Sequence, residues 1–126
     1  MNPSLSLLVL KTSKIEAMLN FYQALGLTFA QEQHGSGPVH HSCEFAGTVL
    51  EIYPGSDGVA PDRRSGGATS LGFRVPSVDA TLVAVNKFGA AIITQPKDSQ
   101  WGRRAVVADP DGRSVEISQS NEFFNL

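Results

Sequence analysis

SLLVLKTSKIEAML (residues 6–19) aligns with TSLGFRVPSVDATL (residues 69–82) at a constant offset of 63 residues. A second match follows, GTVLE (residues 47–51) against GRSVE (residues 112–116), at an offset of 65 residues. Two matches at nearly the same offset indicate that one structural unit occurs twice. Two copies are too few for a solenoid, so we expect a closed domain with pseudo-twofold symmetry.

Each copy is expected to form a strand, a helix and three further strands. In the first copy, Ser13 fits a helix N-cap and Glu16 completes a capping box. Gly26 supplies the end of that helix. The expected strands are residues 5–10, 28–33, 39–45 and 48–53, with Ala46-Gly47 as the turn between the last two.

The second copy follows the same order. Pro76-Ser77 opens its helix and Gly89 ends it, while DPDG (residues 109–112) forms a tight turn. Its expected strands are residues 70–75, 90–94, 104–108 and 114–118. We therefore expect a single α+β domain over residues 1–126. It would consist of a first βαβββ module at about 4–54, a linker at 55–69, a second module at about 70–119 and a tail at 120–126.

Composition narrows the class of protein. The 126 residues include 10 basic and 12 acidic side chains, so the formal net charge is −2 and no basic patch suggests nucleic-acid binding. No apolar run approaches the roughly 20 residues of a membrane helix, and the first residues do not read as a signal peptide. The single cysteine, Cys43, suits a reducing compartment and is interpreted as a buried, inert thiol. We expect a cytoplasmic protein.

Five segments spread over the chain carry a family resemblance: FYQALGL (21–27), VLEIYP (49–54), LGFRVPSVDA (71–80), WGRR (101–104) and DPDGRSVEI (109–117). Together with the duplication, they resemble the vicinal oxygen chelate superfamily, which includes glyoxalase I, bleomycin-resistance proteins and extradiol dioxygenases. The resemblance implies two βαβββ modules that form a cupped, mostly antiparallel sheet with helices on its outer face. The ligand of such proteins lies inside the cup.

The resemblance also implies where a metal would bind. Metal-dependent members carry a ligand, usually His, on each module's first strand and a Glu on each last strand. Glu51 and Glu116 match the Glu positions, but Leu7 and Ser70 occupy the His positions. Because Leu cannot coordinate a metal and Ser is a poor ligand, we expect no cofactor. A divalent metal would need a non-standard site, such as one built from His40, Glu51 and Glu116.

Strand alternation predicts which side chains face the cup. A two-residue turn at Ala46-Gly47 places Ser42 opposite Glu51 and His40 opposite Tyr53. These four side chains would then face inward, and Cys43, Leu50 and Ile52 would face the core. In the second module Ser70, Gly72 and Arg74 would face inward.

Several of these side chains are candidate site residues. Arg74 would need Glu51, Glu116 or an anionic ligand as its partner, because an unpaired buried charge is costly. Trp101 is expected either to line the mouth of the cup with Arg103 and Arg104 or to pack. His34 is placed at the rim. The candidate ligand-binding residues are His40, Ser42, Tyr53, Ser70, Arg74, Trp101 and Arg104, and the candidate catalytic residues are Glu51 and Glu116.

Three functions fit these observations. The first is a metal-independent protein that binds a small molecule and acts as a homodimer, as in the bleomycin-resistance branch. The second is an enzyme, a glyoxalase-type lyase or isomerase or a dioxygenase-like protein, which uses a shifted metal site or a Glu base. In the metal-free version, Glu51 or Glu116 would abstract a proton beside a carbonyl while Arg74 stabilises the enolate. The third is an interaction module that keeps only the fold.

Overall fold

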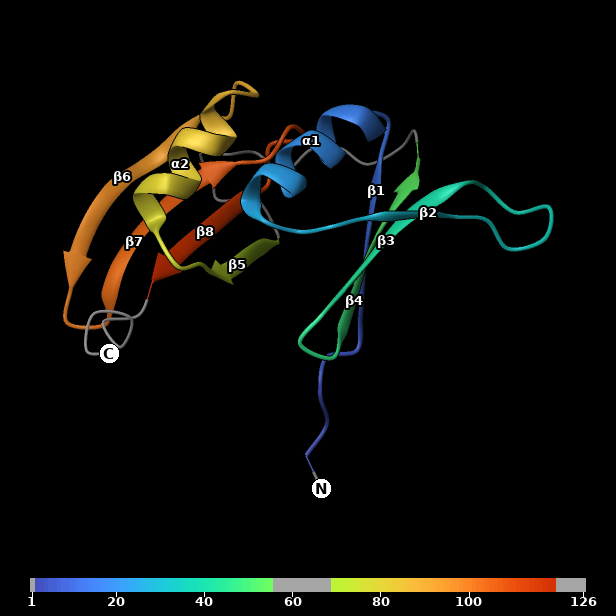
Figure 1. Ribbon diagram of the computed structural model, residues 1–126, viewed down its shortest axis with the longest axis horizontal. Helices are drawn as coiled ribbons and strands as arrows, with labels where there is room; N and C mark the ends of the chain where they lie inside the picture. The colour runs from blue at the N-terminus through green and yellow to red at the C-terminus, as the bar shows by residue number, and fades with distance from the viewer. Residues whose placement is uncertain (1, 56–68, 120–126) are drawn as a thin grey trace. The chain divides into compact units, whose positions relative to one another are not determined.

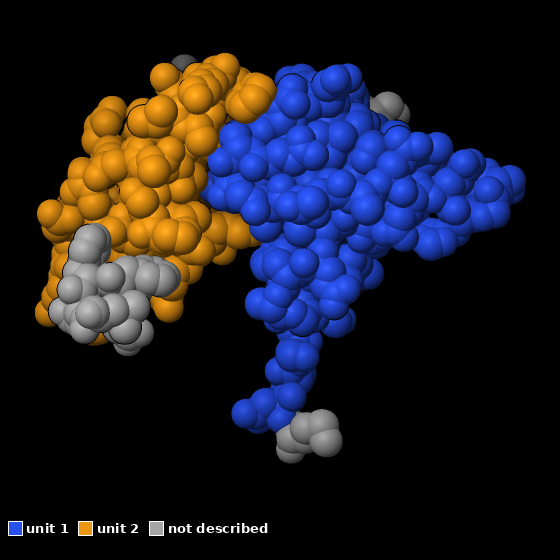
Figure 2. All heavy atoms as spheres, in the orientation of Figure 1, with its two compact units in different colours: residues 1–59 blue, residues 60–126 orange. Residues whose placement is uncertain are grey.

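The computed structural model describes residues 2–55 and 69–119. Almost all of the expected linker and the expected tail lie outside these residues. The chain divides into two compact units, residues 1–59 (unit 1) and 60–126 (unit 2), coloured separately in Figure 2. No described helix has both the length and the apolar character needed to cross a bilayer.

Unit 1 is one βαβββ module (Figure 1). Its elements are β1 (Leu7–Thr12), α1 (Ile15–Leu25), β2 (Ala30–Glu32), β3 (His40–Phe45) and β4 (Thr48–Pro54). The four strands form one mixed sheet in the order β1-β4-β3-β2, in which only β1 and β4 run parallel. The helix packs against β4, and the buried apolar core of the unit comprises Leu10, Met18, Phe21, Tyr22, Leu25, Cys43, Leu50 and Ile52.

Unit 2 repeats this plan. Its elements are β5 (Ser70–Arg74), α2 (Val78–Asn86), β6 (Ile92–Ser99), β7 (Gly102–Ala108) and β8 (Ser114–Gln119). Figure 1 shows the strands side by side in the order β5-β8-β7-β6, again with one parallel pair, β5 and β8. The predicted fold class, α+β with two βαβββ modules, is therefore confirmed.

The two helices begin differently. Ser77 caps α2 as predicted, because its Oγ accepts the backbone N–H of Ala80 at 3.1 Å. The prediction for α1 was wrong. Lys14, and not Ser13, is the N-cap residue, and no side chain caps the helix. The hydroxyl of Thr12 accepts the N–H of Lys14 at 2.9 Å, so a local turn at the end of β1 takes the place of the expected capping box.

Three turns were predicted correctly. Gly26 ends α1 with a φ of 123°, a backbone conformation that favours glycine. Asp109 organises the DPDG turn by accepting the backbone N–H groups of Asp111 and Arg113 at 2.9 and 3.0 Å. The third, Ala46-Gly47, determines the register of β3 against β4 and thereby positions the candidate site.

Candidate functional site

The β3–β4 hairpin fixes which side chains share a face of the unit 1 sheet. Ala46 and Gly47 have φ values of 50° and 82°, the pair of positive angles typical of a tight two-residue hairpin. The turn places Ser42 directly opposite Glu51, as predicted. Alternation along the strands then puts His40, Ser42, Glu51 and Tyr53 on one face, which we call the Glu51 face. The opposite face carries Cys43, Leu50 and Ile52, which are buried against α1.

His40 occupies the most enclosed position on the Glu51 face, with 1% of its surface exposed. Its ring stacks on that of Tyr53, with the centroids 4.1 Å apart and the planes 8° from parallel. The Nδ1 atom lies 3.2 Å from the carbonyl oxygen of Pro38. Because a carbonyl can only accept, Nδ1 carries the proton, and Nε2 of the neutral ring holds a lone pair.

That Nε2 atom is buried and makes no hydrogen bond. The Glu51 Oε2 atom lies 3.4 Å away, close enough for an ion pair with a protonated ring but without hydrogen-bond geometry. A buried acceptor without a donor is unfavourable by roughly 1–3 kcal/mol. Within residues 2–55 and 69–119, it is the buried side-chain polar atom that lacks a hydrogen-bond partner, and such an atom is a candidate ligand contact.

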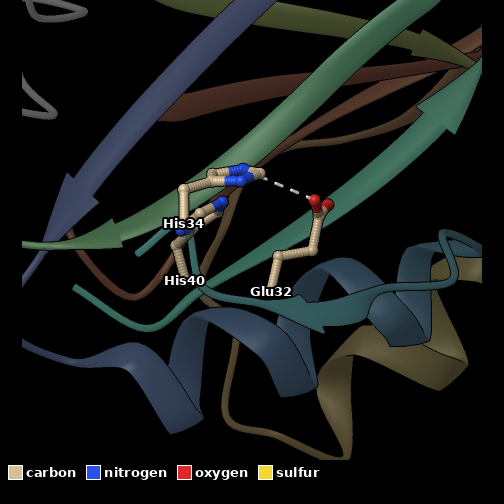
Figure 3. Close-up of side chains that lie close together, drawn as sticks. All are labelled: Glu32, His34 and His40. Carbon is tan, nitrogen blue, oxygen red and sulfur yellow. Dashed lines mark ion pairs between the residues drawn. The ribbon is translucent and has the colours of Figure 1, made fainter. Parts of the chain in front are cut away.

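Two further residues reach His40 from β2 and the connection that follows it. Glu32 lies opposite His40 in the β2–β3 ladder. His34 Nε2 is 3.7 Å from Glu32 Oε2, and the rings of His34 and His40 are 5.1 Å apart (Figure 3). One ligand atom from each of Glu32, His34 and His40 lies within 4.8 Å of the other two, so this group could hold a metal ion. We call it the Glu32–His34–His40 group.

The pKa of Tyr53 reflects the negative charge on the Glu51 face. Desolvation, followed by the negative charges of Glu51 and Glu32, raises the pKa of Tyr53 above its ordinary value. Both carboxylates therefore act on the same small region of the sheet. A cation or a hydrogen-bond donor bound there would relieve this negative potential.

Unit 2 carries a corresponding charged pair. The Nε and Nη2 atoms of Arg104 both lie 2.6 Å from Glu116 Oε1. Val106 lies opposite Glu116, so Arg104 is two residues before that position, just as His40 is two residues before Ser42. Gly72 also lies opposite Glu116, and a Cβ atom there would be 3.7 Å from Oε2. Arg104–Glu116 and His40–Glu51 are thus the same diagonal pair in the two units.

The remaining candidates of unit 2 are dispersed. Ser70 Oγ donates to the carbonyl of Ser114 at 3.2 Å, and Arg74 is exposed opposite Ser118. Arg74 was expected to face inward with Glu51, Glu116 or an anionic ligand as its partner; it is exposed, and Glu116 pairs with Arg104 instead. Trp101 is 83% exposed, which excludes the packing alternative within its unit.

The first strands place apolar or small residues beside the two glutamates. Val9, two residues after the predicted position Leu7, lies directly opposite Glu51, and Gly72, two residues after Ser70, lies opposite Glu116. Neither Val nor Gly offers a side-chain donor to a metal. Of the shifted site predicted from His40, Glu51 and Glu116, His40 and Glu51 lie 3.4 Å apart within unit 1, and Glu116 of unit 2 is bound by Arg104.

Glu32 was missed by sequence reasoning, and His34 was placed only at the rim. The signal was the E-x-H spacing of residues 32 and 34, which puts both on one side of an extended chain. Interpreting that spacing also requires the pairing of β2 with β3, and β2 is only three residues long.

Comparison with known proteins agrees with this fold. The family model of the Glyoxalase/Bleomycin resistance protein/Dioxygenase superfamily matches residues 4–117. No curated protein matches the sequence significantly.

Three solved structures illustrate the similarity. A glyoxalase/dioxygenase from Nostoc punctiforme is 22% identical, with a TM-score of 0.76 over 93% of this chain and 90% of its own. A hypothetical protein, SA1046 from S. aureus, is 19% identical with a TM-score of 0.72 over 94% and 95%. TnmS3, an antibiotic binding protein from Streptomyces sp. CB03234, is 24% identical with a TM-score of 0.66 over 94% and 97%. At these identities the similarity shows the fold alone.

Proposed function

Because this chain belongs to the Glyoxalase/Bleomycin resistance protein/Dioxygenase superfamily, we propose that it binds a small organic molecule on the Glu51 face without chemically changing it. The observation that carries the proposal is the exposed apolar pair on β1. Leu7 and Val9 are 50% and 37% exposed and lie on the same face as Glu51. They offer apolar contact at the place where the metal-dependent relatives would coordinate a metal.

The neighbouring side chains favour a particular ligand chemistry. The stacked pair His40–Tyr53 provides an aromatic surface, and Glu32 and Glu51 provide hydrogen-bond acceptors with negative charge. A planar aromatic molecule that carries a positive charge or hydrogen-bond donors suits this combination. The antibiotic-binding neighbour TnmS3 supports a binding role for the same fold.

The test uses two aromatic dyes of opposite charge, ethidium and 8-anilinonaphthalene-1-sulfonate, titrated into EDTA-treated protein by calorimetry. We expect ethidium to bind once per chain and the anionic dye to bind at least tenfold more weakly. Loss of a charge-assisted contact is worth about 1.5–3 kcal/mol, so Glu51→Gln should weaken ethidium binding by roughly tenfold or more.

The matched control is Glu16→Gln, which removes the same charge from an exposed position on α1. Equal affinity for both dyes, or equal effects of the two substitutions, would contradict the proposal. If neither dye binds, an interaction module that has kept only the fold becomes the better explanation. Recovery of the bound dye unaltered, checked by mass spectrometry, separates binding from turnover.

A second candidate function is supported by the Glu32–His34–His40 group. In a lyase, isomerase or dioxygenase-like enzyme this group would hold the metal, and Glu51 would act as the base beside it. Proton exchange next to the carbonyl of dihydroxyacetone in D₂O, followed by NMR with zinc-loaded protein, tests this alternative. Exchange that exceeds the buffer rate and is lost in Glu51→Gln would favour the enzyme.

We also propose a homodimer. The exposed apolar side chains on β1 would be covered by a partner chain, and the resemblance to the bleomycin-resistance branch implies a binding cleft formed with a second subunit. Light scattering at micromolar concentration should give twice the chain mass of 13.4 kDa. A mass of one chain under these conditions would rule the dimer out.

A further inference from the structure

We propose that Glu32, His34 and His40 bind one divalent transition-metal ion of the zinc type within unit 1. This site uses neither first-strand position of the superfamily's usual metal site. It shares Glu32 and His40 with the surface proposed above for the organic ligand, so the dye titrations, which are performed in EDTA, test that ligand with no metal present. Three features favour metal binding here: the orientation of the His40 ring, the distances between the donor atoms and the balance of charge.

His40 has the arrangement of a histidine that is built to bind a metal. Metal-ligating imidazoles usually donate one ring N–H to a carbonyl or carboxylate, which orients the ring and leaves the other nitrogen free. Here Nδ1 is held by the Pro38 carbonyl at 3.2 Å, and Nε2 is buried without a hydrogen bond. The stacked ring of Tyr53 restrains rotation of the imidazole. A metal ion would satisfy the lone pair that the protein itself leaves unpaired.

The distances approach those of a tetrahedral site. Donor atoms at about 2.0–2.1 Å from a tetrahedral zinc ion lie roughly 3.3–3.4 Å from one another. The Glu32 and His34 donors are 3.7 Å apart, and all three donors lie within 4.8 Å of one another. His34 can close the difference, because its side chain is 73% exposed and it stands on the connection between β2 and β3. His40, in contrast, is fixed.

The ligand types select the metal. Two imidazoles and one carboxylate are typical of zinc and of ferrous iron, whereas magnesium and calcium prefer oxygen ligands alone. Glu51 Oε2 lies 3.4 Å from His40 Nε2 and adds a second negative charge beside the group. Two carboxylates thus balance the two positive charges of the ion. A tetrahedral ion with these three ligands keeps one position open for water or another ligand.

The experiment titrates ZnCl₂ into untagged, EDTA-dialysed protein by calorimetry, with MgCl₂ as the comparison. We expect one zinc ion per chain with a dissociation constant in the micromolar range or below, and no measurable magnesium binding. Glu32→Gln and His34→Asn should each weaken zinc binding by at least tenfold. Both side chains lie at or near the surface, so these variants should keep the fold.

His41→Asn is the matched control. His41 is adjacent to His40 on β3 but lies opposite Ile52, on the other face of the sheet. We expect its zinc affinity to stay within twofold of the parent protein. A second readout, the ¹⁵N shift of His40 Nε2 on zinc addition, does not depend on removing a buried side chain. Absence of zinc binding, binding that survives Glu32→Gln and His34→Asn, or equal loss in His41→Asn would each overturn the proposal.

Discussion

Replacing His40 with Phe tests whether the buried imidazole serves stability or ligand binding. The substitution removes the hydrogen bond from Nδ1 to Pro38, a loss of about 1 kcal/mol. It also removes the buried, unpaired Nε2, a gain of roughly 1–3 kcal/mol. The aromatic contact with Tyr53 is kept, and the larger ring introduces crowding of about 1 kcal/mol or more.

These contributions nearly cancel, so His40→Phe should change the free energy of unfolding by less than about 1 kcal/mol. His40→Ala is different, because it leaves a cavity at a site that is 1% exposed and should cost roughly 2–4 kcal/mol. Urea unfolding of the EDTA-treated proteins, followed by circular dichroism, measures both values. A near-neutral Phe variant combined with loss of zinc-dependent stabilisation would identify His40 as a residue kept for its ligand.

The contrary result is equally clear. If His40→Phe destabilises the metal-free protein by more than about 2 kcal/mol, the imidazole must make a stabilising contact that Phe cannot make. The nearest candidate is a charge-assisted bond from a protonated ring to Glu51, 3.4 Å away. Glu51→Gln in the same assay would then cost a similar amount. In that case Nε2 would be paired with Glu51 in the folded protein and would not be a vacant ligand position.

Further predictions concern the pH response and the helix ends. The pKa of Tyr53 is raised in the folded state, so the contribution of its phenol to stability is present below the unfolded pKa near 10. That contribution is lost as the pH rises through the higher folded pKa. Glu51→Gln should lower the folded pKa of Tyr53, as measured by phenolate absorbance in a variant whose other tyrosine is replaced by Phe. Ser77→Ala should destabilise the protein by about 1 kcal/mol, whereas Ser13→Ala, which removes no cap, should stay within about 0.5 kcal/mol in the same urea assay. Gln119→Leu should cost roughly 1–3 kcal/mol, because its side-chain oxygen accepts the first N–H of α2 at 2.6 Å; a change below about 0.5 kcal/mol would contradict this role.

The parts of the site that follow from local rules could be predicted from the sequence. Ala46-Gly47 permits only a tight hairpin, and a two-residue loop fixes the pairing of every residue on both strands. The positions of Ser42 and Glu51, and the stacking partner of His40, follow from that single turn. The duplicated pattern likewise predicts that each module contains a strand, a helix and three further strands in that sequence.

The parts that depend on a longer connection could not be predicted. Seven residues separate Glu32 from His40, and nothing in them fixes the register of a strand that is only three residues long. The position of His34 over His40 therefore appears only in the folded chain. The partner of Glu116 was also open, because Arg74 and Arg104 both alternate onto its face and only geometry distinguishes them.

The Ser13 prediction failed for a different reason. Thr12 and Ser13 are adjacent hydroxyl residues at the end of a strand, and either could bind the backbone N–H groups at the start of the helix. The structure shows that Thr12 does so while still part of β1, which moves the first turn of the helix by one residue. Sequence patterns often leave the boundaries of an element uncertain by this amount.

The equivalence of His40–Glu51 and Arg104–Glu116 has a consequence for how the two halves can diverge. Both copies keep the acid at one end of the diagonal, and they differ only in the nitrogen base at the other end. A guanidinium has no lone pair available for coordination and is always charged, so Arg104 itself can bind only electron-rich groups. An imidazole can donate electrons to a metal, so the first copy can act as a Lewis base. The same two positions thus carry a base that can donate a lone pair in the first copy and a permanent cation in the second. Exchanging the nitrogen bases, His40→Arg or Arg104→His, would show how far each unit accepts the chemistry of the other.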